Sequence, residues 1–109
     1  MINFIESEFR TPNFSLESLT EKFGFSVYYW SRFFKEKIKC LFSDYLWSLR
    51  SSEAKKLLKE TDLSVKDIVS SVGYFDTTAF IRRFKSCEGI TPGQYRKIYG
   101  NGAADTVKP

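Results

Sequence analysis

The sequence predicts an all-α fold in which two helix-turn-helix subdomains are joined by a long central helix, with about seven helices in all. Two observations predict this fold. Apolar residues recur every three or four positions through residues 2–99, which is the spacing of amphipathic helices. The pattern of residues 15–45 also returns in residues 64–95, so that one structural unit occurs twice. We therefore expect one double helix-turn-helix domain over residues 1–99.

The composition allows such a fold and restricts the classes of function. The chain has 109 residues, of which 42% are hydrophobic, so one small domain can bury a core. The net charge of +4 permits a polyanionic partner. The sequence has no histidine, and Cys40 lies far from Cys87, so we expect reduced thiols, no metal and no cofactor. Because no apolar run of about 18 residues occurs, we expect no membrane contact and a cytoplasmic location.

The first helix-turn-helix unit covers about residues 15–39 and follows a short amphipathic helix that ends before Pro12. Ser15 is a suitable N-cap for the first helix of this unit, and Gly24 is a suitable stop. After the turn, a second helix is expected over about residues 27–38. Its inward face carries the aromatic residues Trp30, Phe33 and Phe34.

The connecting helix is expected over about residues 42–60, because apolar residues keep helical spacing over that length. Residues 50–53, in its middle, are Arg-Ser-Ser-Glu and interrupt the apolar stripe. We therefore expect each end of this helix to pack in a separate small core. The middle of the helix is expected to be more solvated than its ends.

The second helix-turn-helix unit covers about residues 64–99 and has the most detailed signals. A serine caps its first helix, and Gly73 can take the positive φ that ends that helix. Asp76 is a suitable N-cap for a helix over about residues 77–87. A Thr-Pro-Gly-Gln capping box then starts the last helix. Residues 100–109 lack periodicity, and we expect them to form a disordered tail.

The two units correspond position by position. Trp30 and Phe34 of the first unit match Phe80 and Phe84 of the second, so a core residue replaces a core residue. The outward cations match as well: Arg32 with Arg82, and Lys35 with Lys85. Both units therefore place apolar residues on the inner face and cations on the outer face of their second helix. Two helices that each read a DNA groove require this arrangement.

This pattern resembles the DNA-binding domain of AraC/XylS-type transcription regulators. The resemblance covers nearly everything from Ile2 to Ile98. It is carried mainly by Ile68-x-x-x-Val72-Gly73-Tyr74-x-Asp76-x-x-x-Phe80-x-Arg82-x-Phe84-Lys85-x-x-x-Gly89-x-Thr91-Pro92-x-x-Tyr95-Arg96. It implies a sequence-specific DNA-binding regulator in which the second helix of each unit enters the major groove. It also implies that the connecting helix holds these recognition helices about one DNA turn apart.

Carried over by position, the resemblance implies that outward residues of both recognition helices contact DNA. In the first helix these are Tyr28, Ser31, Arg32 and Lys35. In the second they are Thr77, Thr78, Ile81, Arg82 and Lys85. Arginine can bind guanine in bidentate fashion, so Arg32 and Arg82 are the best candidates for base reading, although each could also anchor a phosphate or form a surface salt bridge. We expect Lys35 and Lys85 to contact phosphate, and Tyr28 to be the one aromatic residue that faces outward with the cations.

Some positions depart from the family pattern, mainly in the first unit. Lys39 occupies the position that Gly89 has in the second unit, and a non-glycine residue in the left-handed conformation costs about 1 kcal/mol. Leu41 replaces the small hydroxyl residue expected before the connecting helix. We therefore expect sequence reading to depend mainly on Thr78, Ile81 and Arg82.

The resemblance implies double-stranded DNA as the partner, with RNA polymerase as a further candidate. It also implies a longer regulator, of which this chain is the C-terminal part beside a separate sensor or dimerisation domain. The alternative is a helical protein-interaction module whose arginine and aromatic faces meet another protein. An enzyme is not expected, because no glycine-rich phosphate loop, nucleophile elbow or paired-carboxylate arrangement occurs.

Overall fold

The computed structural model describes residues 1–100, and these residues form helices without any strand. Its elements are α1 (Ile2–Glu8), α2 (Leu16–Phe23), α3 (Val27–Phe33), the π-helical turn η1 (Phe34–Ile38), α4 (Phe42–Glu60), α5 (Val65–Ser71), α6 (Thr77–Glu88) and α7 (Pro92–Tyr99). The predicted all-α fold with two helix-turn-helix units is confirmed. The predicted disordered tail lies outside the described residues, except for Gly100.

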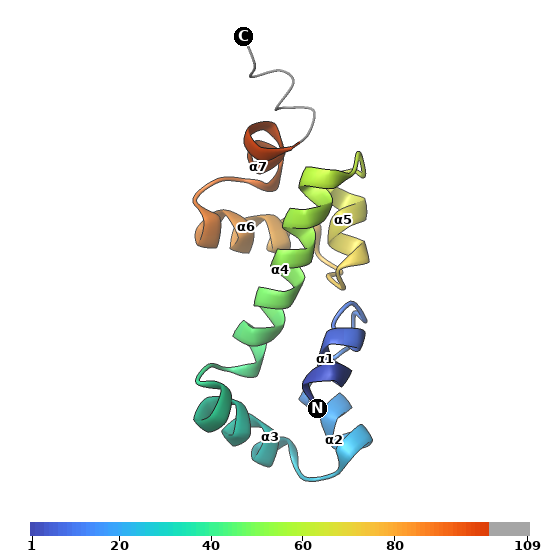
Figure 1. The fold of residues 1–109 in the computed structure, drawn as a ribbon, viewed down its shortest axis with the longest axis vertical. Helices are drawn as coiled ribbons and strands as arrows, with labels where there is room; N and C mark the ends of the chain where they lie inside the picture. The colour runs from blue at the N-terminus through green and yellow to red at the C-terminus, as the bar shows by residue number, and fades with distance from the viewer. Residues whose placement is uncertain (101–109) are drawn as a thin grey trace.

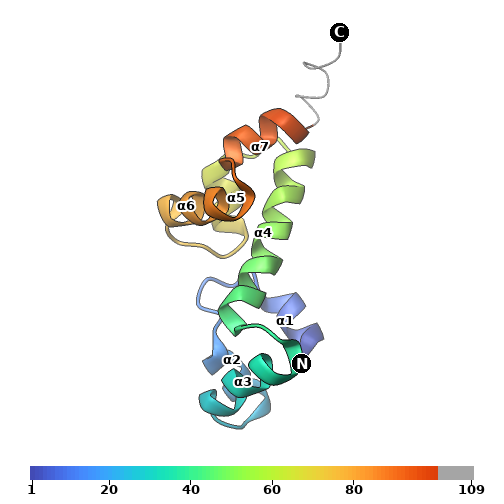
Figure 2. The ribbon, with the colours of Figure 1, turned by 90° about the vertical axis from the view of Figure 1, so that its left-hand side faces the viewer.

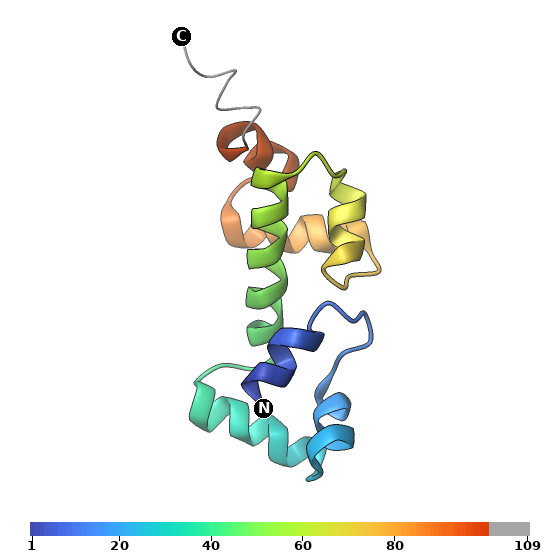
Figure 3. The ribbon, with the colours of Figure 1, turned by 45° about the vertical axis from the view of Figure 1, so that its right-hand side comes forward.

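The molecule is a rod built along α4, as Figure 1 shows. Its principal extents are 56, 24 and 23 Å. The helices α1, α2 and α3 surround the N-terminal half of α4 and form with it the N-terminal subdomain (Figure 3). The helices α5, α6 and α7 surround the other half and form the C-terminal subdomain. Because α4 has 19 residues, and is therefore about 28 Å long, one helix sets the distance between the subdomains.

Each subdomain has its own hydrophobic core, and α4 contributes side chains to both. The buried residues of the first core are Ile5, Phe9, Phe14, Leu19, Trp30, Phe34, Phe42 and Leu46. Those of the second core are Trp47, Ala54, Leu58, Ile68, Val69, Val72, Phe80 and Phe84. The matched aromatic pairs of the two units are all buried, as their helical spacing predicts. Phe23 and Val72 also correspond, since each precedes the glycine that ends the first helix of its unit, but Phe23 is 38% exposed whereas Val72 is fully buried.

The prediction of a solvated middle for α4 is wrong. Arg50 and Ser51 are only 7% and 6% exposed. The Nε of Arg50 donates to the carbonyl of Phe9 at 2.8 Å, and its Nη2 donates to the carbonyl of Thr11 at 2.9 Å. A charged side chain can be buried when neighbouring groups satisfy its donors, and here the end of α1 supplies the acceptors.

The predicted helix starts are confirmed by side-chain capping. The side chains of Ser26, Ser64, Asp76 and Thr91 each accept a hydrogen bond, at 3.0 or 3.1 Å, from the backbone N–H three residues further on. Leu41 precedes α4 and makes no such bond, because its side chain has no acceptor. These caps fix where α3, α5, α6 and α7 begin and therefore which faces they turn outward.

The two recognition helices end differently. Lys39 adopts φ 72° and Gly89 adopts φ 84°, so the left-handed position predicted at Lys39 is present without a glycine. The N–H of Lys39 donates to the carbonyl of Phe34, five residues back, at 2.9 Å. The N–H of Gly89 donates to the carbonyl of Lys85, four residues back. The first recognition helix therefore closes with a wider, π-helical turn that α6 lacks.

Candidate nucleic-acid interface

The second helices of the two units, α3 with η1 and α6, carry every predicted site residue. Both helices cross the long axis of the molecule, and their C-terminal ends lie on the same side in Figures 1 and 3. Figure 2 views the molecule from that side and shows α6 above α3. The two helices therefore run in the same sense, one in each subdomain.

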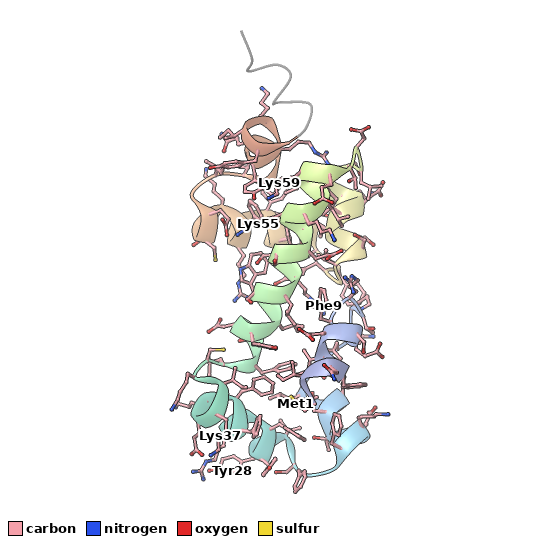
Figure 4. All side chains as sticks on the ribbon, viewed as in Figure 1. Met1, Phe9, Tyr28, Lys37, Lys55 and Lys59 are labelled. Carbon is pink, nitrogen blue, oxygen red and sulfur yellow. The ribbon has the colours of Figure 1, made fainter. Side chains whose placement is uncertain are left out.

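The predicted residues of the first recognition helix lie together on its outer surface. Tyr28 is 69% exposed, and Ser31, Arg32 and Lys35 are also exposed. These four side chains line one hollow of about 460 Å³ together with Glu36. Figure 4 shows Tyr28 at the end of the subdomain that lies farthest from α7. The first half of the predicted site is therefore one continuous exposed surface.

Glu36 is a member of this surface that sequence reasoning missed. Its Oε1 lies 2.8 Å from Nη2 of Arg32, and the guanidinium of Arg32 lies 5.8 Å from the centroid of the Tyr28 ring. The hydrogen bond from Arg32 lowers the pKa of the Glu36 carboxyl. The four-residue spacing of Arg32 and Glu36 on one helix predicts this ion pair. One Nη2 donor of Arg32 is therefore already engaged by Glu36 in the free protein.

The second recognition helix presents its cations differently. Thr78, Arg82 and Lys85 are exposed, whereas Thr77 and Ile81 are partly buried. Within residues 1–100, neither Arg82 nor Lys85 has an ion-pair partner. The guanidinium of Arg82 is therefore available to an external acceptor.

Arg83 has a different role from its neighbour Arg82. Its Nη2 lies 3.1 Å from Oδ1 of Asp44, and its guanidinium lies 4.8 Å from the centroid of the Trp47 ring. Both partners belong to α4. These contacts of Arg83 hold α6 against the central helix. Of the two arginines, only Arg82 has no ion-pair partner within residues 1–100.

The prediction that Tyr28 is the one outward aromatic residue is wrong. Tyr29 is 42% exposed, and Phe25, in the turn before α3, is 62% exposed. The rings of Phe25 and Tyr29 stack with their centroids 4.3 Å apart. Phe75, which precedes α6 at the matching place, is 75% exposed. Each recognition helix therefore begins beside an exposed phenylalanine.

Within residues 1–100, no group of histidine, cysteine, aspartate or glutamate residues could hold a metal ion. Cys40 and Cys87 are free thiols. None of the helices that the structure describes is both long enough and apolar enough to span a lipid bilayer.

Comparison with known sequences places most of the chain in one family. Residues 19–98 match the family model of a helix-turn-helix domain. The uncharacterized transcriptional regulator YtdP of Bacillus subtilis is 39% identical over 97 residues, which are 89% of this chain and 12% of YtdP. The probable transcription factor PqrA of Proteus vulgaris is 29% identical over 98 residues, and YijO of Escherichia coli is 35% identical over 83. The chain spans 80% of PqrA but only 29% of YijO.

Solved structures share the fold. The C-terminal domain of the response regulator yesN from Fusobacterium nucleatum is 40% identical with a TM-score of 0.83, over 86% of this chain and 91% of that one. The C-terminal domain of AraT, a response regulator from Geobacillus stearothermophilus, is 32% identical with a TM-score of 0.86, over 90% and 81%. The DNA-binding domain of AdpA, solved with a target DNA, is 22% identical with a TM-score of 0.82, over 90% and 87%, and shows the same fold.

Proposed function

Because this chain belongs to the AraC/XylS family of helix-turn-helix transcription regulators, we propose that its helices α3 and α6 enter successive major grooves of one DNA duplex. The observation that carries the proposal is the pair of cationic helices that run in the same sense, one in each subdomain. The major groove of B-DNA admits an α-helix, and successive grooves on one face lie about 34 Å apart. The length of α4, about 28 Å, is of the same order. One copy of the domain would thus read an asymmetric site.

The second recognition helix is proposed as the main reader. Arg82 has no ion-pair partner within residues 1–100, so it can take a guanine O6 and N7 without first giving up an acceptor. Thr78 is exposed, and the partly buried Ile81 still offers apolar surface to a thymine methyl group. Lys85, near the end of the helix, is assigned to phosphate.

The first recognition helix is proposed to read with Tyr28, Ser31 and Arg32. Arg32 already donates to Glu36, so the Glu36 carboxylate lies beside any base that Arg32 binds. A carboxylate repels phosphate and can accept a hydrogen bond from cytosine N4. The first helix therefore contributes less attraction to an arbitrary duplex than α6 does. Lys35 is assigned to phosphate, and Thr77 to a supporting contact at the start of α6.

The salt dependence of duplex binding tests this function. The logarithm of the binding constant should fall linearly with the logarithm of the salt concentration, by about 0.9 for each phosphate neutralised. Lys85→Ala should reduce the slope by about this amount. Lys59→Ala is the comparison variant, because Lys59 is exposed on α4 and belongs to neither recognition helix, and its slope should not change. A flat salt response, or no binding at low salt, would favour the alternative of a protein-interaction module.

We also propose that the chain works as the C-terminal DNA-binding part of a longer cytoplasmic regulator with a separate sensor or dimerisation domain. Two findings support this: the chain spans 12% of YtdP, and the yesN and AraT structures are C-terminal domains of response regulators. We propose no enzymatic activity for this domain. One relative, AdaA of Bacillus subtilis, is named a bifunctional transcriptional activator and DNA repair enzyme, and the chain spans 44% of it. RNA polymerase is a further proposed partner, which a ternary complex on promoter DNA in a mobility-shift assay would reveal.

A further inference from the structure

The two subdomains touch each other beside the middle of α4. The loop that follows α1 reaches the turn between α5 and α6, and Figures 1 and 2 show these two segments adjacent. A Cβ atom on Gly73 would lie 2.8 Å from the carbonyl oxygen of Arg10 and 3.0 Å from Nη2 of Arg50. These distances are shorter than a Cβ contact allows, so the loop can approach this closely only because residue 73 is glycine.

Arg50 lies in the middle of this contact. Its two hydrogen bonds hold the carbonyls of Phe9 and Thr11, at the C-terminal end of α1 in the N-terminal subdomain. Its guanidinium also lies 5.5 Å from the centroid of the Tyr74 ring, which packs in the core of the C-terminal subdomain. One buried cation therefore contacts both subdomains.

An ion pair also ties the same loop to α4. Nη2 of Arg10 lies 3.2 Å from Oε1 of Glu53, one turn further along α4 than Arg50. Figure 4 places Phe9 at the end of α1 that faces the C-terminal subdomain. The loop of residues 9–11 is thus held at the junction from two successive turns of α4.

We propose that Arg50 is a positioning residue for DNA reading, because it locks the loop after α1 against the α5–α6 turn and so fixes the angle between α3 and α6. Together with the length of α4, this angle sets the spacing and the relative rotation of the two half-sites that the domain accepts. The proposal rests on the proposed function, since it assumes that both helices enter the same duplex. Under this proposal, Arg50 determines the specificity of the domain without touching DNA.

The central helix alone does not fix this angle. Long helices bend, and the first core packs on α4 as far as Leu49 while the second core begins at Trp47, so the subdomains can shift relative to each other unless a contact away from the helix axis resists them. The Arg50 contact is such a restraint. Arginine suits the position because its planar fork can donate to two carbonyls while its face rests on an aromatic ring. Lysine has three donors but no planar fork, so it would hold the same groups less rigidly.

Arg96 provides a matched control for Arg50. Its Nε donates to the carbonyl of Leu58 and its Nη2 to the carbonyl of Thr61, both at 3.1 Å. Like Arg50, it caps the C-terminal end of a helix, but its partners belong to the same subdomain. Arg96→Met and Arg50→Met should therefore both lower stability, whereas only Arg50→Met should change the geometry between the subdomains.

The test measures binding to sites of altered spacing. An operator is first selected with the unmodified chain. It is then prepared in two forms, one with the native spacing and one with two base pairs inserted between the half-sites. The insertion rotates one half-site by about 70° and moves it by about 7 Å. The unmodified chain and Arg96→Met should bind the altered site at least about tenfold more weakly than the native one. For Arg50→Met this ratio should fall to less than about threefold, and Arg50→Lys should give an intermediate ratio.

The outcomes separate the proposals. If Arg50→Met keeps the spacing discrimination of Arg96→Met, Arg50 is only a structural residue and the inference is overturned. If Arg50→Met does not fold, Glu53→Gln decides, since it removes only the Arg10 ion pair: weaker discrimination supports the inference, and full discrimination overturns it. If the unmodified chain binds no duplex at low salt, it is the proposed function that has failed.

Discussion

Replacing Gly73 with alanine should destabilise the domain much more than replacing Gly89 with alanine, although both glycines have a positive φ. The φ of Gly73 is 101° and that of Gly89 is 84°, so in each case alanine enters a conformation that L-residues rarely adopt. Their surroundings differ. Nothing lies within 4 Å of a Cβ built on Gly89, whereas a Cβ on Gly73 would meet the Arg10 carbonyl and the Arg50 guanidinium.

The magnitude follows from these contacts. The backbone strain alone should cost about 1–2 kcal/mol at either position. At Gly73 the added methyl group must also displace a backbone carbonyl, and overpacking of this kind costs about 1–3 kcal/mol more. The hydrogen bonds from Arg50 to Phe9 and Thr11 stretch when the loop moves, which adds to the loss. We therefore expect about 1 kcal/mol for Gly89→Ala and about 3–4 kcal/mol for Gly73→Ala.

Urea and thermal denaturation, followed by circular dichroism at 222 nm, measure these differences. Since 1 kcal/mol shifts the melting temperature of a domain of this size by about 4–8 °C, the two variants should melt at least about 8 °C apart. Equal losses at Gly73 and Gly89 would refute the close contact between the two subdomains.

Three further predictions concern the recognition helices. Asp76→Ala removes the acceptor for the N–H of Ala79 and should lower the free energy of unfolding by about 1 kcal/mol, measured by urea denaturation. Lys39→Gly relieves the left-handed strain at φ 72° and should raise the urea midpoint by the equivalent of about 0.5–1 kcal/mol, whereas a lower midpoint would show that the lysine side chain is needed there. In selections from randomised duplexes, Arg82→Ala should relax one base position, at about 1–3 kcal/mol, while Lys85→Ala should weaken all duplexes alike; the reverse result would exchange their roles.

The helices and their caps could be predicted from the sequence because their signals are local. Asp76 lies three residues before the N–H that it accepts, and Phe80 and Phe84 share a face through their spacing alone. The left-handed position at Lys39 was also predictable, because the matching position in the second unit is a glycine. The left-handed conformation of Lys39 was predicted from the repeat, because the first unit alone has no glycine at that position.

The contact between the subdomains could not be predicted in the same way. Arg50 is about 40 residues from its acceptors, and a polar run inside an apolar stripe is usually a solvated face. Its burial depends on where the carbonyls at the end of α1 point, which is decided only when α1 packs on α4. The pairing of Arg32 with Glu36 is different, since its four-residue spacing was visible in the sequence.

The shared central helix makes the domain unequally tolerant of insertions and deletions. The turn that follows Gly73 is one residue longer than the turn that follows Gly24, and both recognition helices still form with the same length of 12 residues, counting η1 with α3. An extra residue inside α4 would instead turn the whole C-terminal subdomain by about 100° and advance it by about 1.5 Å. The α3 and α6 helices would then face different sides of the rod. The length of α4 is thus constrained, whereas the turn before a recognition helix can differ by one residue without a change in the length of that helix.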